Sequence, residues 1–111
     1  MVESSKSSGE NADQFRFGDQ AISASQVFIA RKHVYAMVSP CSPYTFHVLI
    51  CPTRVVARFT DLTELETIEL FVCAKEIAKK FEDQFNKKYR SFSYVIQDGG
   101  SAGSKVRHVH I

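Results

Sequence analysis

Apolar stretches in the first half of the chain predict short β-strands. Residues 27–30 and 34–38 are rich in β-branched and aromatic side chains, and the polar residues that separate them predict a hairpin. Residues 47–51 predict a further strand, which we expect to end at Pro52. Residues 39–43 carry two prolines and therefore predict a loop between these strands.

A long amphipathic helix is predicted to begin after Thr63. Thr63 and Glu66 form a capping box, in which the hydroxyl and the carboxylate satisfy the first free backbone N–H groups. Apolar residues then recur at steps of three and four, which predicts a single stripe facing the core. We expect this stripe to consist of Leu65, Ile68, Val72, Ala78, Phe81 and Phe85.

The apolar pattern changes to a period of two after the helix. Phe92, Tyr94 and Ile96 share one face of a predicted strand. A loop rich in glycine and serine follows over 97–104, and residues 105–111 predict a final strand. Strands, one helix and further strands indicate an α+β fold with an antiparallel sheet of about five strands and one long helix.

Composition fits a single domain behind a polar tail. The chain has 111 residues, 44% of them hydrophobic, which suffices for a modest core. Residues 1–14 are mostly polar and predict a disordered tail before a domain over 15–111. The formal net charge of +2 is too small to favour nucleic acid or an anionic membrane as partner, but it suits an anionic small molecule.

No apolar stretch of the sequence is long enough to span a bilayer, and the first residues lack the apolar segment of a secretory signal. The three cysteines, Cys41, Cys51 and Cys73, are an odd number at unmatched spacings. Such spacings fit reduced thiols better than a disulfide framework or a zinc cluster. We therefore expect an intracellular protein of the cytoplasm or the nucleus.

Two histidines near the end of the sequence are the first candidates for chemistry. Alternation along a strand places His108 and His110 on one face, with their Cβ atoms about 7 Å apart. Three interpretations are open: two ordinary histidines, a metal site without a third ligand, or a neutral imidazole that attacks phosphorus. The glycines of the preceding loop let backbone N–H groups approach an anion, which ranks the phosphate interpretation above the metal one.

Several motifs in a fixed order make the chain similar to a known family. The segments QDG at 97–99, AG at 102–103 and VRHVHI at 106–111 resemble the approach to a histidine triad, His-φ-His-φ-His-φ-φ, where φ is apolar. FRFG at 15–18 and HVLICP at 47–52 match as well. Beyond its polar tail the chain resembles the histidine-triad nucleotide hydrolases, most closely their fragile-histidine-triad branch.

The resemblance implies roles for individual residues. His110 matches the middle histidine, which attacks the α-phosphorus and becomes nucleotidylated, His108 matches the first histidine, and His47 matches a histidine behind the triad. Positions matching phosphate or ribose contacts are Gln97, Gly103, Ser104, Lys105, Val106, Ser39 and Gln20. Positions matching an apolar adenine pocket, for which plain core packing is the alternative, are Phe17, Ile22 and Leu49.

Four positions depart from the family pattern. The sequence ends at Ile111, before the position of the third histidine, and we expect the natural gene product to continue with a histidine next. In the family this third histidine binds the phosphate oxygens. Ser39 stands where a ribose-contacting asparagine is usual, and Gln20 replaces a histidine near the substrate. Phe46 stands in place of the glycine before His47.

The activity that the resemblance implies is hydrolysis of dinucleoside polyphosphates, such as diadenosine triphosphate to AMP and ADP, through a nucleotidyl-histidine intermediate. A divalent cation, Mg or Mn, would be carried by the substrate phosphates, so that no protein-bound cofactor is expected. The family also implies a homodimer. Two alternatives stay open: a nucleoside phosphoramidase of the same superfamily, and a nucleotide-binding module without catalysis.

Overall fold

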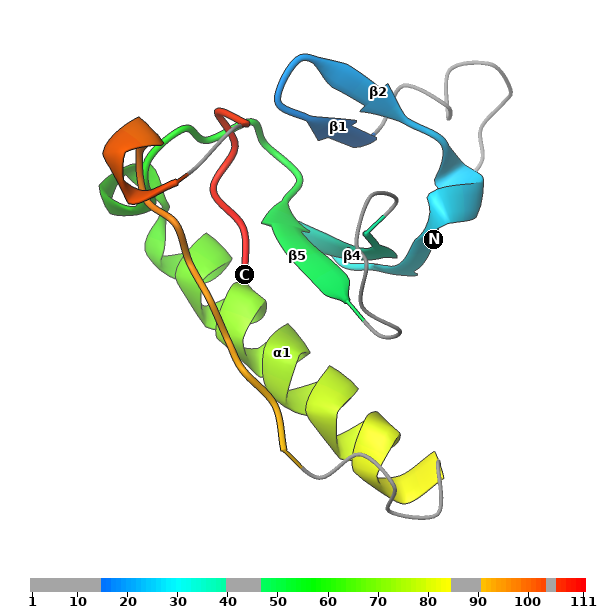
Figure 1. Cartoon of the computed structure of the whole chain (residues 1–111). Helices are drawn as coiled ribbons and strands as arrows, with labels where there is room; N and C mark the ends of the chain where they lie inside the picture. Colours follow the sequence, from blue (N-terminus) through cyan, green and yellow to red (C-terminus); the bar gives the residue numbers. More distant parts are fainter. Residues whose placement is uncertain (1–14, 40–46, 85–90, 104–105) are drawn as a thin grey trace.

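The computed structural model describes residues 15–39, 47–84, 91–103 and 106–111 (Figure 1). The predicted tail over 1–14 lies outside the described residues. The described part contains two antiparallel sheets and one long helix, which confirms the predicted α+β class. Its strands are β1 (Phe15–Phe17), β2 (Gln20–Ile22), β3 (Val27–Ala30), β4 (Val34–Val38) and β5 (Val48–Pro52).

The three-stranded sheet has the order β3-β4-β5, and β1 and β2 form a separate hairpin. The predicted hairpin between β3 and β4 is confirmed, with an irregular register between Val27 and Ile29. Strand β5 begins one residue later than expected and includes Pro52, which pairs with Val34. Short 3-10 helices lie at Ala24–Gln26, Phe59–Asp61 and Gly100–Ala102.

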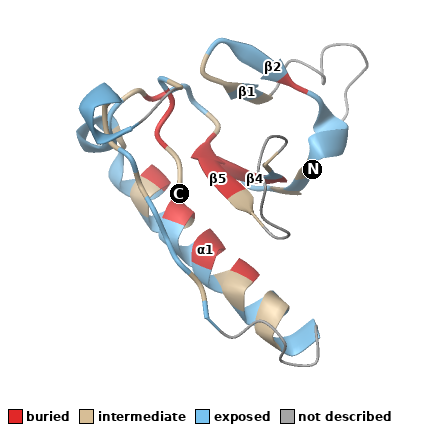
Figure 2. Ribbon diagram, viewed as in Figure 1, coloured by how far each residue is buried: buried red, intermediate tan, exposed pale blue. Residues whose placement is uncertain are grey.

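Strand β4 lies at the centre of the core and is buried on both faces, which explains its continuous apolar run (Figure 2). Val34 and Ala36 pack towards the long helix, and Tyr35 and Met37 pack on the opposite side. Ile22 of the β1–β2 hairpin belongs to this second cluster. The helix and the hairpin therefore sandwich the sheet between them.

The helix α1 (Glu64–Gln84) begins where the capping box predicted. The Thr63 N–H donates to Glu66 Oε1 at 2.8 Å, and the Glu66 N–H donates to Thr63 Oγ1 at 3.1 Å. No helix within the described part of the chain is long and apolar enough to cross a membrane.

The predicted buried stripe of α1 is wrong for three of its six members, while Ala78 is partly buried. Leu65, Ile68 and Val72 are 59%, 52% and 45% exposed, whereas the core side is formed by Leu70, Cys73, Ala74 and Ile77. Phe81 is partly buried against that core, and Phe85 lies outside the described residues. The small side chains of Cys73 and Ala74 allow close approach to the sheet, so steric fit selects this face over the neighbouring apolar one.

The two strands predicted after α1 do not form. No strand is found over 91–98 or 106–111, although Phe92 packs against Phe81 with ring centroids 6.3 Å apart. The final segment instead lies beside β5, where Ile50 and Ile111 exchange two backbone hydrogen bonds of 2.9 and 3.0 Å. A strand requires a ladder of such bonds, and one pair does not amount to a ladder.

Candidate active site

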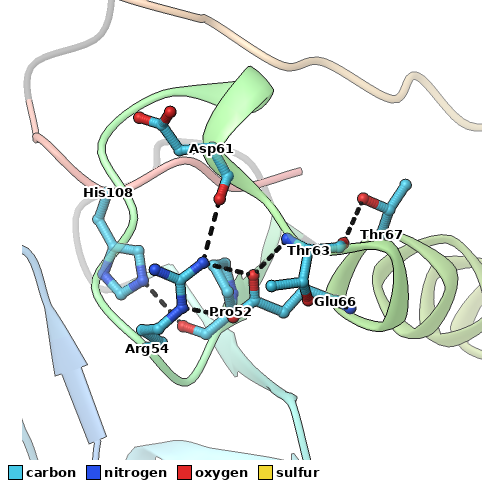
Figure 3. A network of polar contacts seen from close by, with 7 residues as sticks. All are labelled: Pro52, Arg54, Asp61, Thr63, Glu66, Thr67 and His108. Atoms are coloured by element: carbon cyan, nitrogen blue, oxygen red, sulfur yellow. Dashed lines mark hydrogen bonds and ion pairs between the residues drawn. The ribbon is translucent and has the colours of Figure 1, made fainter.

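Both ring nitrogens of His108 are hydrogen-bonded, and the side chain is fully buried. Figure 3 shows the bond to Pro52. The Gly18 N–H donates to Nδ1 at 2.9 Å, and Nε2 lies 2.8 Å from the Pro52 carbonyl oxygen. Because Nδ1 accepts a hydrogen bond and a carbonyl can only accept, the ring proton must reside on Nε2. The structure therefore fixes His108 as one neutral tautomer.

The electrostatics of the site agree with this tautomer. Burial lowers the pKa of His108 below its ordinary value, and the neighbouring His110 lowers it further. The Pro52 carbonyl opposes this shift because it accepts the Nε2 proton, but burial outweighs it. The buried imidazole is thus held neutral under conditions in which an exposed histidine begins to take up a proton.

His110 is oriented by a backbone atom of His108. Its Nδ1 lies 2.9 Å from the His108 carbonyl oxygen, so this nitrogen carries the proton and donates. In the neutral ring the lone pair then resides on Nε2, the nitrogen that can act as a nucleophile. The ring is half-buried and lines a cavity of about 1050 Å³.

The ring of Phe17, in strand β1, contacts the imidazoles of both His108 and His110. Its ring meets His110 edge-on, with centroids 5.1 Å apart, and lies 5.8 Å from the His108 ring. The hairpin that carries Phe17 is attached to the sheet because the Tyr35 hydroxyl donates to the Arg16 carbonyl at 2.6 Å. The β1–β2 hairpin is therefore a wall of the site and not only a cover for the core.

The cavity brings together many residues from distant parts of the sequence. Of the predicted site residues, those that line it are Phe17, Ser39, His47, Leu49, Gln97, Gly103, Val106 and His110. Three others do not line it: His108 is buried behind it, Gln20 is exposed on β2, and Ile22 packs in the core beside Tyr35. Ser104 and Lys105 lie outside the described residues, as does Phe46.

The glycine-rich loop is fitted closely around Gln97. Gly103 has a φ of +100°, and a Cβ atom built there would lie 2.8 Å from Gln97 Nε2. Glycine alone combines that backbone conformation with such a close approach. The amide of Gln97 and the loop backbone thus face the cavity from one side, where N–H groups could meet an anion.

Asp98 fastens this loop to the segment before α1. Its Oδ1 accepts hydrogen bonds from Arg58 Nε and from the Phe59 N–H, both at 2.9 Å. The Arg58 guanidinium lowers the pKa of Asp98, so the carboxylate stays charged. Within the described part of the chain, no group of three or more His, Cys, Asp or Glu side chains gathers as a metal site would require.

Sequence reasoning missed three groups that build the site: the Gly18 N–H, the Pro52 carbonyl and the Asp98 carboxylate. Gly18 and Pro52 lie 90 and 56 residues away from His108. Both belong to segments that resemble family motifs, which is the signal that could have drawn attention to them. Asp98 belongs to the QDG segment at 97–99, and in the structure it pairs with Arg58.

The model of the HIT domain family matches residues 20–111, and the chain belongs to this family. It is 43% identical over 97 residues to the bifunctional bis(5'-adenosyl)-triphosphatase/adenylylsulfatase FHIT of Arabidopsis thaliana, covering 87% of this chain and 53% of the relative. It is 38% identical to a bis(5'-adenosyl)-triphosphatase of Dictyostelium discoideum, covering 86% of this chain and 62% of that protein. The chain thus spans only about half to three fifths of these relatives.

Solved structures agree with the fold. The diadenosine triphosphate hydrolase of Plasmodium falciparum, crystallised with Cyclomarin A, superposes with a TM-score of 0.82 at 30% identity. The match covers 95% of this chain and 67% of that one. The NitFhit protein of Caenorhabditis elegans gives a TM-score of 0.80 at 38% identity, covering 86% of this chain and 23% of that one.

Proposed function

We propose that the protein hydrolyses dinucleoside polyphosphates such as diadenosine triphosphate, giving AMP and ADP. The observation that carries the proposal is the orientation of His110: its Nδ1 lies against the His108 carbonyl oxygen, which leaves Nε2 as the nitrogen available for attack, and the ring lines a large cavity. The names of the relatives from Arabidopsis and Dictyostelium support the choice of substrate.

The proposed reaction has two displacements at the α-phosphorus. In the first, His110 Nε2 forms a bond to phosphorus, the bond from phosphorus to the bridging oxygen breaks, and ADP leaves with that electron pair. In the second, water attacks the same phosphorus, the bond to nitrogen breaks, and AMP is released with a proton passing to solvent. A covalent intermediate of this kind divides one difficult step into two easier ones.

His108 has a supporting role in this mechanism. While phosphorus is bonded to His110 Nε2, the His110 ring is positively charged, and its Nδ1–H points at the His108 carbonyl oxygen. A carbonyl dipole aimed at a developing positive charge stabilises it without needing to reorganise. The buried neutral ring of His108 then holds that part of the backbone in place through its bonds to Gly18 and Pro52.

Three further properties belong to the proposal. A divalent cation, Mg or Mn, is carried by the substrate phosphates and neutralises part of their charge. Two copies of the chain associate through the exposed apolar residues of α1, among them Leu65, Ile68 and Phe71. An intracellular location, in the cytoplasm or the nucleus, is favoured because Cys51 and Cys73 are buried free thiols.

Intact-mass measurement after incubation with diadenosine triphosphate tests the proposal. We expect the mass to rise by one AMP, and we expect His110→Ala to abolish this adduct. His33→Ala is the matched control, because His33 does not line the cavity and its backbone bonds to Glu69 and Thr53 need no imidazole. An adduct that survives His110→Ala would contradict the proposed nucleophile.

The same experiment separates the alternatives. Saturable binding of the dinucleotide without adduct or turnover would identify a nucleotide-binding module. Faster cleavage of a lysyl-AMP phosphoramidate than of diadenosine triphosphate would identify a nucleoside phosphoramidase, because only the leaving group differs between the two substrates.

A further inference from the structure

The carbonyl that accepts the His108 proton belongs to Pro52, the last residue of β5, and the segment just after it is tied to the N-terminus of α1 (Figure 3). Arg54, two residues after Pro52, donates to both carboxylate oxygens of Glu66, from Nε at 3.0 Å and from Nη2 at 2.9 Å. Its Nη2 also donates to the Asp61 carbonyl at 3.1 Å. Such a two-pronged contact fixes the direction of the guanidinium as well as its distance.

Glu66 is itself held firmly at the other end of this contact. The side chain is almost completely buried, and its Oε1 accepts the Thr63 N–H of the capping box. Hydrogen bonding from Arg54 lowers the pKa of Glu66, so the buried carboxylate is charged. A capping box needs only a side-chain oxygen at this position, which a neutral glutamine also supplies. The charge of Glu66 therefore calls for a second explanation.

We infer that Arg54 and Glu66 are a positioning pair for the histidines of the site. The pair joins the segment just after β5 to the first turn of α1, and so adds to the β4–β5 pairing in holding the Pro52 carbonyl where it accepts the His108 Nε2 proton. The His108 carbonyl in turn orients the His110 ring. Neither Arg54 nor Glu66 lines the cavity, so the pair acts through His108 and not on a substrate.

A merely stabilising ion pair is the competing explanation, and the chain offers a matched control for it. Arg31 and Glu76 form a second Arg–Glu pair between the sheet side and α1. Both partners are about two fifths exposed, and their hydrogen bond does not involve the segment after Pro52. If ion pairing to the helix were all that mattered, conservative changes in either pair would have the same effect on the histidine rings.

The test compares four single substitutions, each of which keeps the approximate size of the side chain and leaves it polar. Arg54→Lys keeps the charge but loses the two-pronged contact. Glu66→Gln loses the charge but keeps the capping oxygen, so that the helix still begins at residue 64. Arg31→Lys and Glu76→Gln make the same two changes in the control pair.

Nitrogen-15 NMR of the histidine rings is the first readout, because it reports which ring nitrogen carries the proton. We expect the Nε2-protonated tautomer of His108 in the unsubstituted chain and in both control variants. We expect Arg54→Lys and Glu66→Gln to show a mixture of the two tautomers. The second readout is kcat for diadenosine triphosphate, expected to fall roughly tenfold with KM unchanged, as for other groups that orient a functional histidine from behind.

The NMR result stands apart from the proposed function on which the kcat readout rests. If no variant forms adduct or turns over substrate while the tautomer mixture still appears, the proposed function fails and the positioning pair stands. If His108 keeps a single tautomer in Arg54→Lys and in Glu66→Gln, both with folded spectra like those of the control variants, the inference is overturned.

Discussion

The substitution Gly18→Ala tests how the β1–β2 hairpin is held over the site. Gly18 has a φ of +66°, and a Cβ atom built on it would lie 2.7 Å from Val106 Cγ1. The left-handed backbone costs roughly 1–2 kcal/mol for an L-residue with a side chain. Relieving the contact with Val106 adds about 1–2 kcal/mol, as for other crowded packing sites. We expect a loss of roughly 2–4 kcal/mol in the free energy of unfolding.

Urea unfolding of the two chains measures this loss, and Gly100→Ala is the matched control. A Cβ atom at Gly100 meets nothing within 4 Å, and its φ is not in the left-handed region. The control should therefore unfold within about 0.5 kcal/mol of the unsubstituted chain. Equal unfolding midpoints for Gly18→Ala and Gly100→Ala would refute the argument. A structure of the Gly18→Ala variant in which the hairpin is unmoved and the same N–H still donates to His108 would also refute it.

Three further predictions concern stability and the loop. Burial lowers the pKa of His108 in the folded chain below its value in the unfolded chain. The neutral ring therefore contributes to stability above about pH 6.5, and this contribution is lost as the pH falls below that value. Urea unfolding at a series of pH values measures the loss. Leu70→Ala should cost about 2–5 kcal/mol in unfolding free energy, against about 0.5 kcal/mol for Lys80→Ala at an exposed position of α1; equal losses would contradict the assigned core face of α1. Asp98→Asn should weaken AMP binding on the order of fivefold by loosening the loop, whereas Asp83→Asn should leave the calorimetric Kd unchanged.

Local sequence rules predicted the elements whose signals lie within a few residues of each other. The capping box of Thr63 and Glu66 marked the start of α1, and β-branched runs marked the β3–β4 hairpin. These rules failed where an element has more than one apolar face and tertiary packing determines which face is buried. Helix α1 carries apolar residues on more than one face, and only the shape of the sheet decides that Leu70 is buried and Leu65 is not.

The same distinction between local signals and long-range packing applies to the candidate site. Spacing alone placed His108 and His110 on one face of a predicted strand and left their role open, and the family resemblance pointed to Gln97 and Gly103 on the loop. No periodicity could show that His108 receives one hydrogen bond from a residue 90 positions earlier. Such contacts follow from the packing of the hairpin on the sheet, which depends on the whole core.

The groups that orient the two imidazoles are backbone atoms, and this has a chemical consequence. A carboxylate that orients a histidine loses its effect when it is protonated, whereas the carbonyls of Pro52 and His108 stay neutral acceptors at every pH. Acid can act on the arrangement at the buried imidazole of His108, whose Nδ1 would have to give up the Gly18 N–H in order to take a proton. Side chains can alter these backbone acceptors only indirectly, by moving the segments that carry them, and for the Pro52 carbonyl Arg54 is well placed to do so.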